Sequence, residues 1–117
     1  MKHIKINTPL QAVAGFSTAE AVIIITGYQL NLNKYFGSSA MPNSTNKSLT
    51  IQYSTYKSYT DYNATEQPMQ LKSSLPYYNE QVAESKNSYT IDELYTLLNT
   101  KLTASDYDVE LNDGEAV

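Results

Sequence analysis

The chain has 117 residues, with eight basic side chains that are all lysine, twelve carboxylates and a net charge of −4. It contains no cysteine, arginine or tryptophan, which excludes disulfides and thiolate metal sites. The negative net charge and the absence of arginine also disfavour a nucleic-acid-binding protein, because such proteins rely on a basic surface and on arginine contacts. The length predicts one β-rich domain over residues 1–105, followed over 106–117 by an acidic C-terminal tail or edge strand.

Two apolar segments near the N-terminus are too short or too interrupted to cross a membrane. Leu10–Phe16 is broken at Gly15 and soon followed by Glu20, and the purely apolar run Ala21–Ile25 has five residues. A transmembrane helix takes about 20 apolar residues. We therefore expect a soluble chain with no cleaved export signal and no membrane partner.

The first expected strand spans Lys2–Ile6, where polar and apolar residues alternate. On this pattern His3 lies opposite Ile4 and Ile6, on the exposed face. It is the only histidine of the chain, and histidine is the commonest general acid–base group. We expect it on the surface, without a catalytic role. The next segment, Leu10–Gly15, is either a connector or a second short strand.

The strongest strand prediction covers Glu20–Leu32. Its β-branched run Val22–Ile25 indicates burial on both faces, and from Thr26 onward the pattern changes to alternation, as in a strand that leaves the core. One side of the alternating part carries Tyr28, Leu30 and Leu32. The segment Gly37–Ser48 is rich in turn-forming residues and is expected to form a long surface loop.

The most unusual segment has a tyrosine at every third position, at Tyr53, Tyr56, Tyr59 and Tyr62. If it is an extended strand, Tyr53 and Tyr59 point to one side and Tyr56 and Tyr62 to the other. We expect the first pair inward and the second outward. The tyrosines would stack on sugar rings, anchor a protein interface, or form cross-strand pairs in a sheet. The absence of tryptophan, the usual carbohydrate platform, favours the second and third uses.

The segments after the tyrosines are less regular. Asn63–Pro68 breaks the strand, Met69–Leu71 is expected to return as its partner, and Leu75–Tyr78 forms an extended aromatic patch that includes Tyr77. A polar stretch, Asn79–Ser88, follows.

One helix is well specified, over about residues 91–102. Thr90 and Glu93 form a capping box, in which each side chain accepts a hydrogen bond from the other residue's backbone N–H. An apolar stripe at helical spacing follows and comprises Ile91, Leu94, Tyr95, Leu98 and Leu102, with Leu97 beside it. After the helix, residues 106–111 alternate in the manner of an edge strand.

The inventory of chemical groups does not point to an enzyme. There is no second histidine, no nucleophile elbow and no glycine-rich phosphate loop. A calcium loop that began at Asp106 would need glycine at its sixth position and glutamate at its twelfth, where the chain has Leu111 and Val117. We therefore expect no catalytic residues, no metal site and no cofactor, and interpret the acidic segment as an edge that discourages aggregation.

Together these patterns predict a mainly β fold, a β-sandwich or a small barrel with one C-terminal α-helix. We expect a non-enzymatic assembly protein that binds copies of itself or other structural proteins, as a homo-oligomer or ring. The expected interface residues are Tyr53, Tyr56, Tyr59, Tyr62, Tyr77 and Tyr78. The alternative is a carbohydrate-binding or adhesin module that uses the segment 53–62.

In overall style the chain resembles the small structural proteins of tailed-bacteriophage virions, such as head–tail adaptor, tail, collar and decoration proteins. The features that carry the resemblance are Met1, the cysteine-free β-rich composition, the strand Val22–Ile25, the tyrosine segment and the acidic end Asp113-Gly114-Glu115. The resemblance implies a virion component made in the host cytoplasm, which assembles into rings or lattices by strand pairing and tail exchange. It transfers no functional residue. Without it, a cytoplasmic location is expected.

Overall fold

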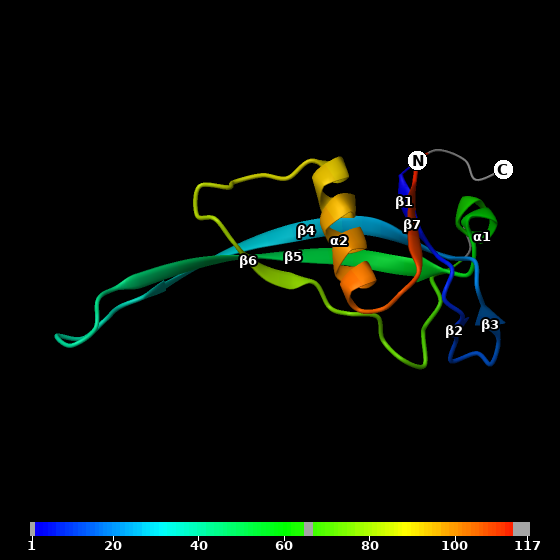
Figure 1. Cartoon of the computed structure of the whole chain (residues 1–117), viewed down its shortest axis with the longest axis horizontal. Coiled ribbons are helices and arrows are strands. Elements are labelled where there is room, and N and C mark those ends of the chain that lie inside the picture. Colours follow the sequence, from blue (N-terminus) through cyan, green and yellow to red (C-terminus); the bar gives the residue numbers. More distant parts are fainter. Residues whose placement is uncertain (1, 65–66, 114–117) are drawn as a thin grey trace.

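The computed structural model describes residues 2–64 and 67–113, and its main feature is one five-stranded antiparallel sheet (Figure 1). In spatial order the strands are β6 (Asn79–Val82), β5 (Ser44–Tyr56), β4 (Ala21–Tyr35), β1 (His3–Ile6) and β7 (Val109–Asn112). A small hairpin of β2 (Leu10–Gln11) and β3 (Ser17–Thr18) stands apart, and the helices are α1 (Tyr59–Asn63) and α2 (Ile91–Ala104). The predicted mainly β class with one long helix near the C-terminus is confirmed, with the sheet curved as a half-barrel.

The core lies between the sheet and α2, which crosses one face of it (Figure 1). We call this side the helix face. Its main buried residues are Ile4, Ile6, Ile23, Ile25, Leu49 and Ile51 from the sheet and Leu94, Tyr95, Leu98 and Leu102 from α2. The hydroxyl of Tyr95 accepts a hydrogen bond of 2.9 Å from the backbone N–H of Ile25. This bond lies beyond the last β1–β4 pair, Ile4 with Ile23, so a side chain satisfies a strand N–H that would otherwise be buried without a partner.

The capping box at the start of α2 is confirmed. Thr90 Oγ1 accepts from the N–H of Glu93 at 3.2 Å, and Glu93 Oε1 accepts from the N–H of Thr90 at 3.0 Å. The helix runs to Ala104, slightly past the expected end. The prediction that Ile91 belongs to the buried stripe is wrong. Ile91 is 53% exposed, because it lies in the first turn, where the contact between helix and sheet ends.

The opposite side of the sheet, which we call the back face, is also covered at β1. His3 is 0% exposed, and its ring stacks on Tyr59 with 4.2 Å between centroids and 19° between planes. The prediction that His3 lies on the surface is therefore wrong. Alternation correctly assigns it to the face opposite Ile4 and Ile6, but a segment far along the chain returns to cover that face.

That segment is α1, and it ends the predicted tyrosine strand at Tyr56. Ser58 caps the helix, because its Oγ accepts a hydrogen bond of 3.1 Å from the N–H of Asp61. The expectation of an extended strand through Tyr62 is wrong, since a serine three residues before an aspartate begins a helix as readily as it continues a strand. The turn places the Tyr62 ring 5.0 Å from the Tyr56 ring.

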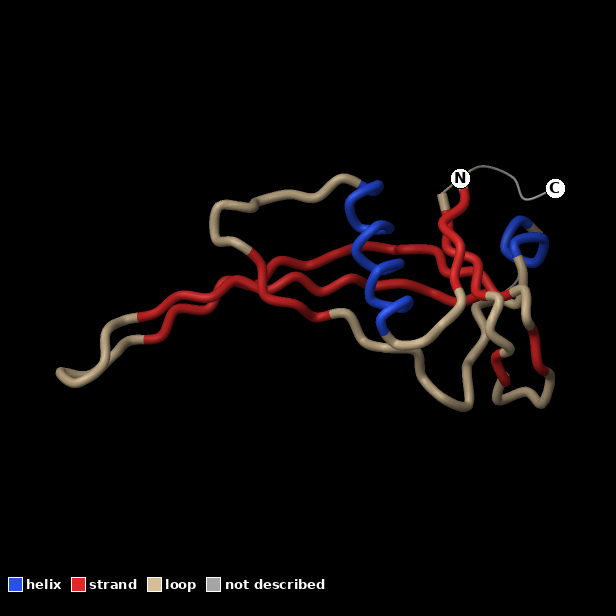
Figure 2. The backbone as a smooth tube through the Cα atoms, viewed as in Figure 1, coloured by secondary structure: helices blue, strands red, loops and turns tan. Residues whose placement is uncertain are grey.

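β4 and β5 form one long hairpin, whose outer part extends far beyond α2 (Figure 2). We call residues 31–48 the arm. It makes the molecule elongated, with extents of 59 × 28 × 24 Å. The predicted loop Gly37–Ser48 is wrong over Ser44–Ser48, which pairs with β4 as far as Tyr35. These polar residues resemble a loop in composition, but a strand open to water on its exposed face accommodates them.

Other segments also depart from the predictions. β6, for which the sequence predicted no strand, forms within the polar stretch and pairs with β5 over Lys47–Thr50. Met69–Leu71 forms no strand, so the predicted partner strand is wrong: Leu71 makes an isolated bridge to Ala12, and a single N–H, that of Met69, donates to the carbonyl of Thr55 on β5 at 2.8 Å. The predicted edge strand over 106–111 is confirmed over 109–111, where β7 pairs with β1 at the edge of the sheet, whereas 106–108 lie outside it. The end of the predicted tail, residues 114–117, lies outside the described residues.

Candidate functional site

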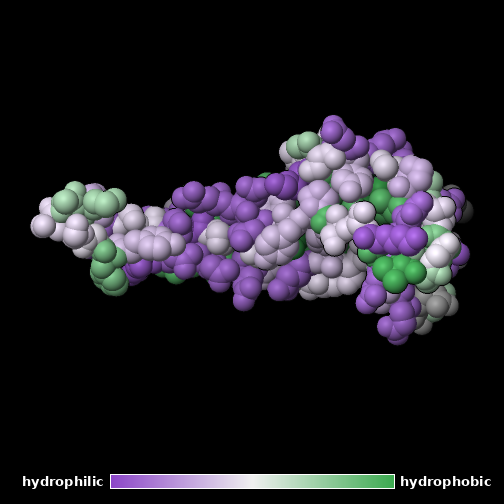
Figure 3. Space-filling view, turned by 90° about the horizontal axis from the view of Figure 1, so that it is seen from below, coloured by the Kyte–Doolittle hydropathy of each residue, from purple (hydrophilic) through white to green (hydrophobic). Residues whose placement is uncertain are grey.

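The arm is the most exposed part of the described chain. Every residue from 31 to 45 is exposed, and several of them are large and apolar. Their exposed fractions are 54% for Leu32, 55% for Tyr35, 86% for Phe36 and 69% for Met41. Figure 3 shows hydrophobic side chains gathered at the far end of the arm. Because no core lies beneath them, this apolar surface does not contribute to the folding of the body.

Local hydrogen bonds shape the tip of the arm. The N–H of Gly37 donates to Asn43 Oδ1 at 2.7 Å, and the N–H of Met41 donates to the carbonyl of Ser38 at 3.1 Å. At Gly37 a Cβ atom would collide with the backbone carbonyl of Met41, so the close approach of the two sides of the turn requires glycine. The turn therefore has a defined shape that presents Phe36 and Met41 outward.

The base of the arm is anchored to the body on the helix face. Lys47 is 8% exposed, and its ammonium donates to the carbonyl of Glu84 at 3.2 Å and to Asn87 Oδ1 at 2.8 Å. The hydroxyl of Tyr28 accepts from the N–H of Tyr89 at 3.2 Å, and the two rings meet edge to face. These contacts hold the base while the outer part projects alone.

A β-bulge at Thr26 sets which residues of the arm lie on each face. The register of β4 and β5 shifts between Ile25 and Gly27, so Thr26 is the extra residue and the alternation restarts after it. Leu30 consequently packs against the core from the helix face. The back face of the arm carries amides and hydroxyls in cross-strand pairs, among them Asn33 and Asn46, whose side chains hydrogen-bond at 3.3 Å.

Charge is distributed unevenly along the chain. No carboxylate occurs between Glu20 and Asp61, a stretch that contains all of β4 and β5. The lysines of this stretch are Lys34, Lys47 and Lys57, and Lys47 is used internally. The arm is thus weakly basic and uncharged over most of its length, in a protein that is acidic overall.

Most of the predicted interface tyrosines belong to the folded body. Tyr59 and Tyr78 are buried, and the hydroxyl of Tyr53 donates to the carbonyl of Pro76 at 3.0 Å. Tyr56 and Tyr62 are half-buried and contact each other in the cluster with Tyr59 on the back face. Among the six, Tyr77 is exposed, at 69%. Residues 53–62 thus form no single exposed row of rings.

The sequence patterns did not predict the apolar tip of the arm. Its only signal in the sequence was the presence of Phe36, Met41 and Pro42 within an otherwise polar stretch.

Alkaline solution is expected to destabilise the fold. Burial raises the pKa of Tyr53, Tyr78 and Tyr95 above the usual value near 10. As the pH rises, these phenols ionise in the unfolded chain at a lower pH than in the folded chain. Their contribution to the free energy of unfolding is therefore fully present below pH 10 and is lost as the pH rises through the folded-state pKa values. Urea unfolding at pH 8 and pH 10.5 measures the loss. Tyr53→Phe should make this loss of stability smaller, whereas Tyr77→Phe should leave it unchanged. Equal losses in the two variants would contradict the attribution of the loss to buried phenols.

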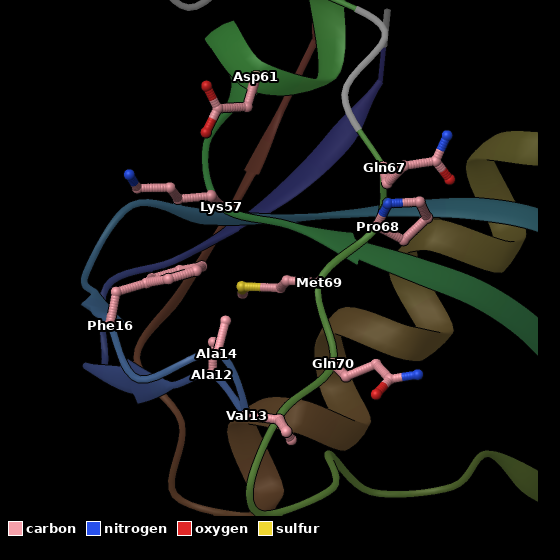
Figure 4. Close-up of a pocket in the computed structure, with 10 residues that line it drawn as sticks. All are labelled: Ala12, Val13, Ala14, Phe16, Lys57, Asp61, Gln67, Pro68, Met69 and Gln70. Atoms are coloured by element: carbon pink, nitrogen blue, oxygen red, sulfur yellow. The ribbon is translucent and has the colours of Figure 1, made fainter.

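The body also has an open cavity of about 610 Å³ between the β2–β3 hairpin, the start of α1 and the segment 67–70 (Figure 4). Phe16 and Met69 point toward one another into it, and the ammonium of Lys57 lies 5.1 Å from the centre of the Phe16 ring. Asp61 is the other titratable side chain of the lining. The residues that line it place no nucleophile beside a base.

Within residues 2–64 and 67–113, no three histidine, cysteine or carboxylate side chains group as a metal site would require. None of the helices there is both long and apolar enough to span a bilayer. Compared with protein-family models, curated proteins and solved structures, the chain has no match.

Proposed function

We propose that this chain is a non-enzymatic assembly protein, which joins copies of itself or other structural proteins into a multi-subunit particle through its arm. Because the overall sequence features of the chain resemble those of tailed-bacteriophage structural proteins, the particle we propose is the virion of such a phage. The observation that carries the proposal is the arm itself: a two-stranded extension past the core, ending in the exposed side chains of Phe36 and Met41.

The physical argument concerns what would cover the tip. A two-stranded hairpin is marginally stable in water by itself, and the outer arm gains no burial from its own body. Burial of Phe36 and of Met41 in a partner is worth about 1.5–3 kcal/mol each. A partner would therefore provide the burial that the arm lacks. In a symmetric particle the same contact repeats around a ring or lattice.

The tyrosines support this proposal less than expected from the sequence, since most are used inside the body. The same arrangement gives no specific support to a carbohydrate-binding module. Such a module presents aromatic rings together on an open surface, whereas Tyr59 is buried against His3 and Tyr56 and Tyr62 meet edge to face. The candidate contact residues are therefore those of the arm, together with the exposed Tyr77.

Native mass spectrometry of the purified chain and of the double variant Phe36→Ser, Met41→Ser tests the proposal. We expect one discrete oligomer for the unmodified chain and at least a tenfold weaker assembly for the variant. The free energy of unfolding should change by less than about 0.5 kcal/mol, because both side chains lie outside the core.

Val13→Ser is the matched control, since Val13 is apolar, 59% exposed and located on the body. It should assemble like the unmodified chain. A monomer at all concentrations, or equal loss of assembly in the control and the double variant, would contradict the proposed function of the arm.

A further inference from the structure

The outer edge of β4 is open along the arm. In the sheet β4 lies between β5 and β1, but its pairing with β1 covers only Ala21–Ile23. From Gly27 to Tyr35 no described strand lies beyond β4, and no described group hydrogen-bonds to its backbone on that side. This open edge is about 30 Å long. An exposed strand edge is a template for pairing with another chain.

The other two edges of the sheet are protected in the usual ways. β6 and β7 have four residues each, and they carry Glu80 and Glu110. Short length and charge both discourage strand addition. The open edge of β4 has neither proline nor carboxylate, and its single charge is Lys34. The long edge of β4 lacks both forms of protection.

The open segment is complementary to itself in one antiparallel register. If two copies of Gly27–Tyr35 pair over their whole length, Asn31 lies opposite Asn31. On the helix face, Leu30 then lies opposite Leu32, and Lys34 lies opposite Tyr28, an arrangement that favours a cation–π contact.

The other face is equally compatible with this register. Gln29 then lies opposite Asn33, so amides meet amides. Tyr35 lies opposite Gly27, where an aromatic ring covers the bare backbone. The two lysines are not opposite each other, so no like charges are directly paired.

We propose that two copies of this chain pair antiparallel through the edge of β4 from Gly27 to Tyr35, about a two-fold axis at Asn31. The proposal rests on the proposed assembly function and names the interface and register within it. The pairing joins two β4–β5 hairpins into a continuous four-stranded sheet. Continued by one residue, the same register places Phe36 of each copy opposite Thr26 of the other, so each apolar tip lies beside the body of the partner copy.

Single cysteines test the register cleanly, because the chain has no cysteine of its own. Two Cα atoms directly opposite in antiparallel strands are about 4.5–5.5 Å apart, within the range of a disulfide. Asn31→Cys is therefore expected to form a covalent dimer under mild oxidation. Gln29→Cys and Asn33→Cys should each remain monomeric alone, since like positions lie about 14 Å apart. A mixture of those two variants should cross-link.

A charge variant tests the same axis without oxidation. Asn31→Lys places two ammonium groups opposite each other and should weaken dimer formation several-fold. Ser48→Lys is the control, because Ser48 pairs with Asn31 across the hairpin but lies on β5.

The outcomes separate this inference from the proposed function. Cross-linking of the Asn31→Cys variant and of the mixed pair, but not of the single controls, supports the β4 interface. A discrete oligomer for the unmodified chain, without this cross-linking pattern, overturns the β4 interface and leaves the assembly function in place. A monomer at all concentrations with no cross-linking overturns both.

Discussion

Leu98→Ala is expected to lower the free energy of unfolding by about 2–5 kcal/mol. Leu98 is 0% exposed and lies in the core that α2 forms with the sheet. Its truncation removes apolar burial and leaves a cavity that the two rigid elements on either side cannot close. Urea denaturation followed by circular dichroism measures the effect, which should appear as a lower midpoint with an unchanged slope.

The same helix offers a control for this prediction. Ile91→Ala removes a similar side chain that is 53% exposed, and it should cost less than about 0.5 kcal/mol, because the higher helix propensity of alanine partly offsets the lost contacts. Equal losses for the two variants would mean that α2 is not packed on the sheet as described.

Tyr59→Ala is expected to cost about 3 kcal/mol, close to the value for other buried aromatic side chains. The ring of Tyr59 is 7% exposed, stacks on His3 and lies beside Tyr62. Its removal would expose the imidazole and uncover the back face of β1 and β4. Thermal and urea unfolding of the variant measure the loss.

Tyr77→Ala is the matched control, because Tyr77 was predicted as an interface residue and is 69% exposed. Its stability should stay within about 0.5 kcal/mol of the unmodified chain. If Tyr59→Ala instead kept full stability and lost only assembly, Tyr59 would be an interface anchor and the packing of the back face would be wrong.

The sequence by itself determined the features that depend on neighbouring residues. The capping box of Thr90 and Glu93 and the stripe after it specified α2, because caps and helical periodicity act within a few turns. The run Val22–Ile25 specified a strand buried on both faces, and the structure shows all four residues buried. The mainly β class with one long helix followed from these local signals.

Only the tertiary structure decided which faces are covered and where the hairpin leaves the core. His3 is buried because α1 returns over it, and a strand's alternation assigns a side chain to a face without saying what covers that face. Phe36 and Met41 are at the tip because β4 and β5 remain paired beyond the last contact with the body. The open edge of β4 arises because β1 covers only its beginning. All three depend on contacts between distant segments, which local propensity and periodicity do not encode.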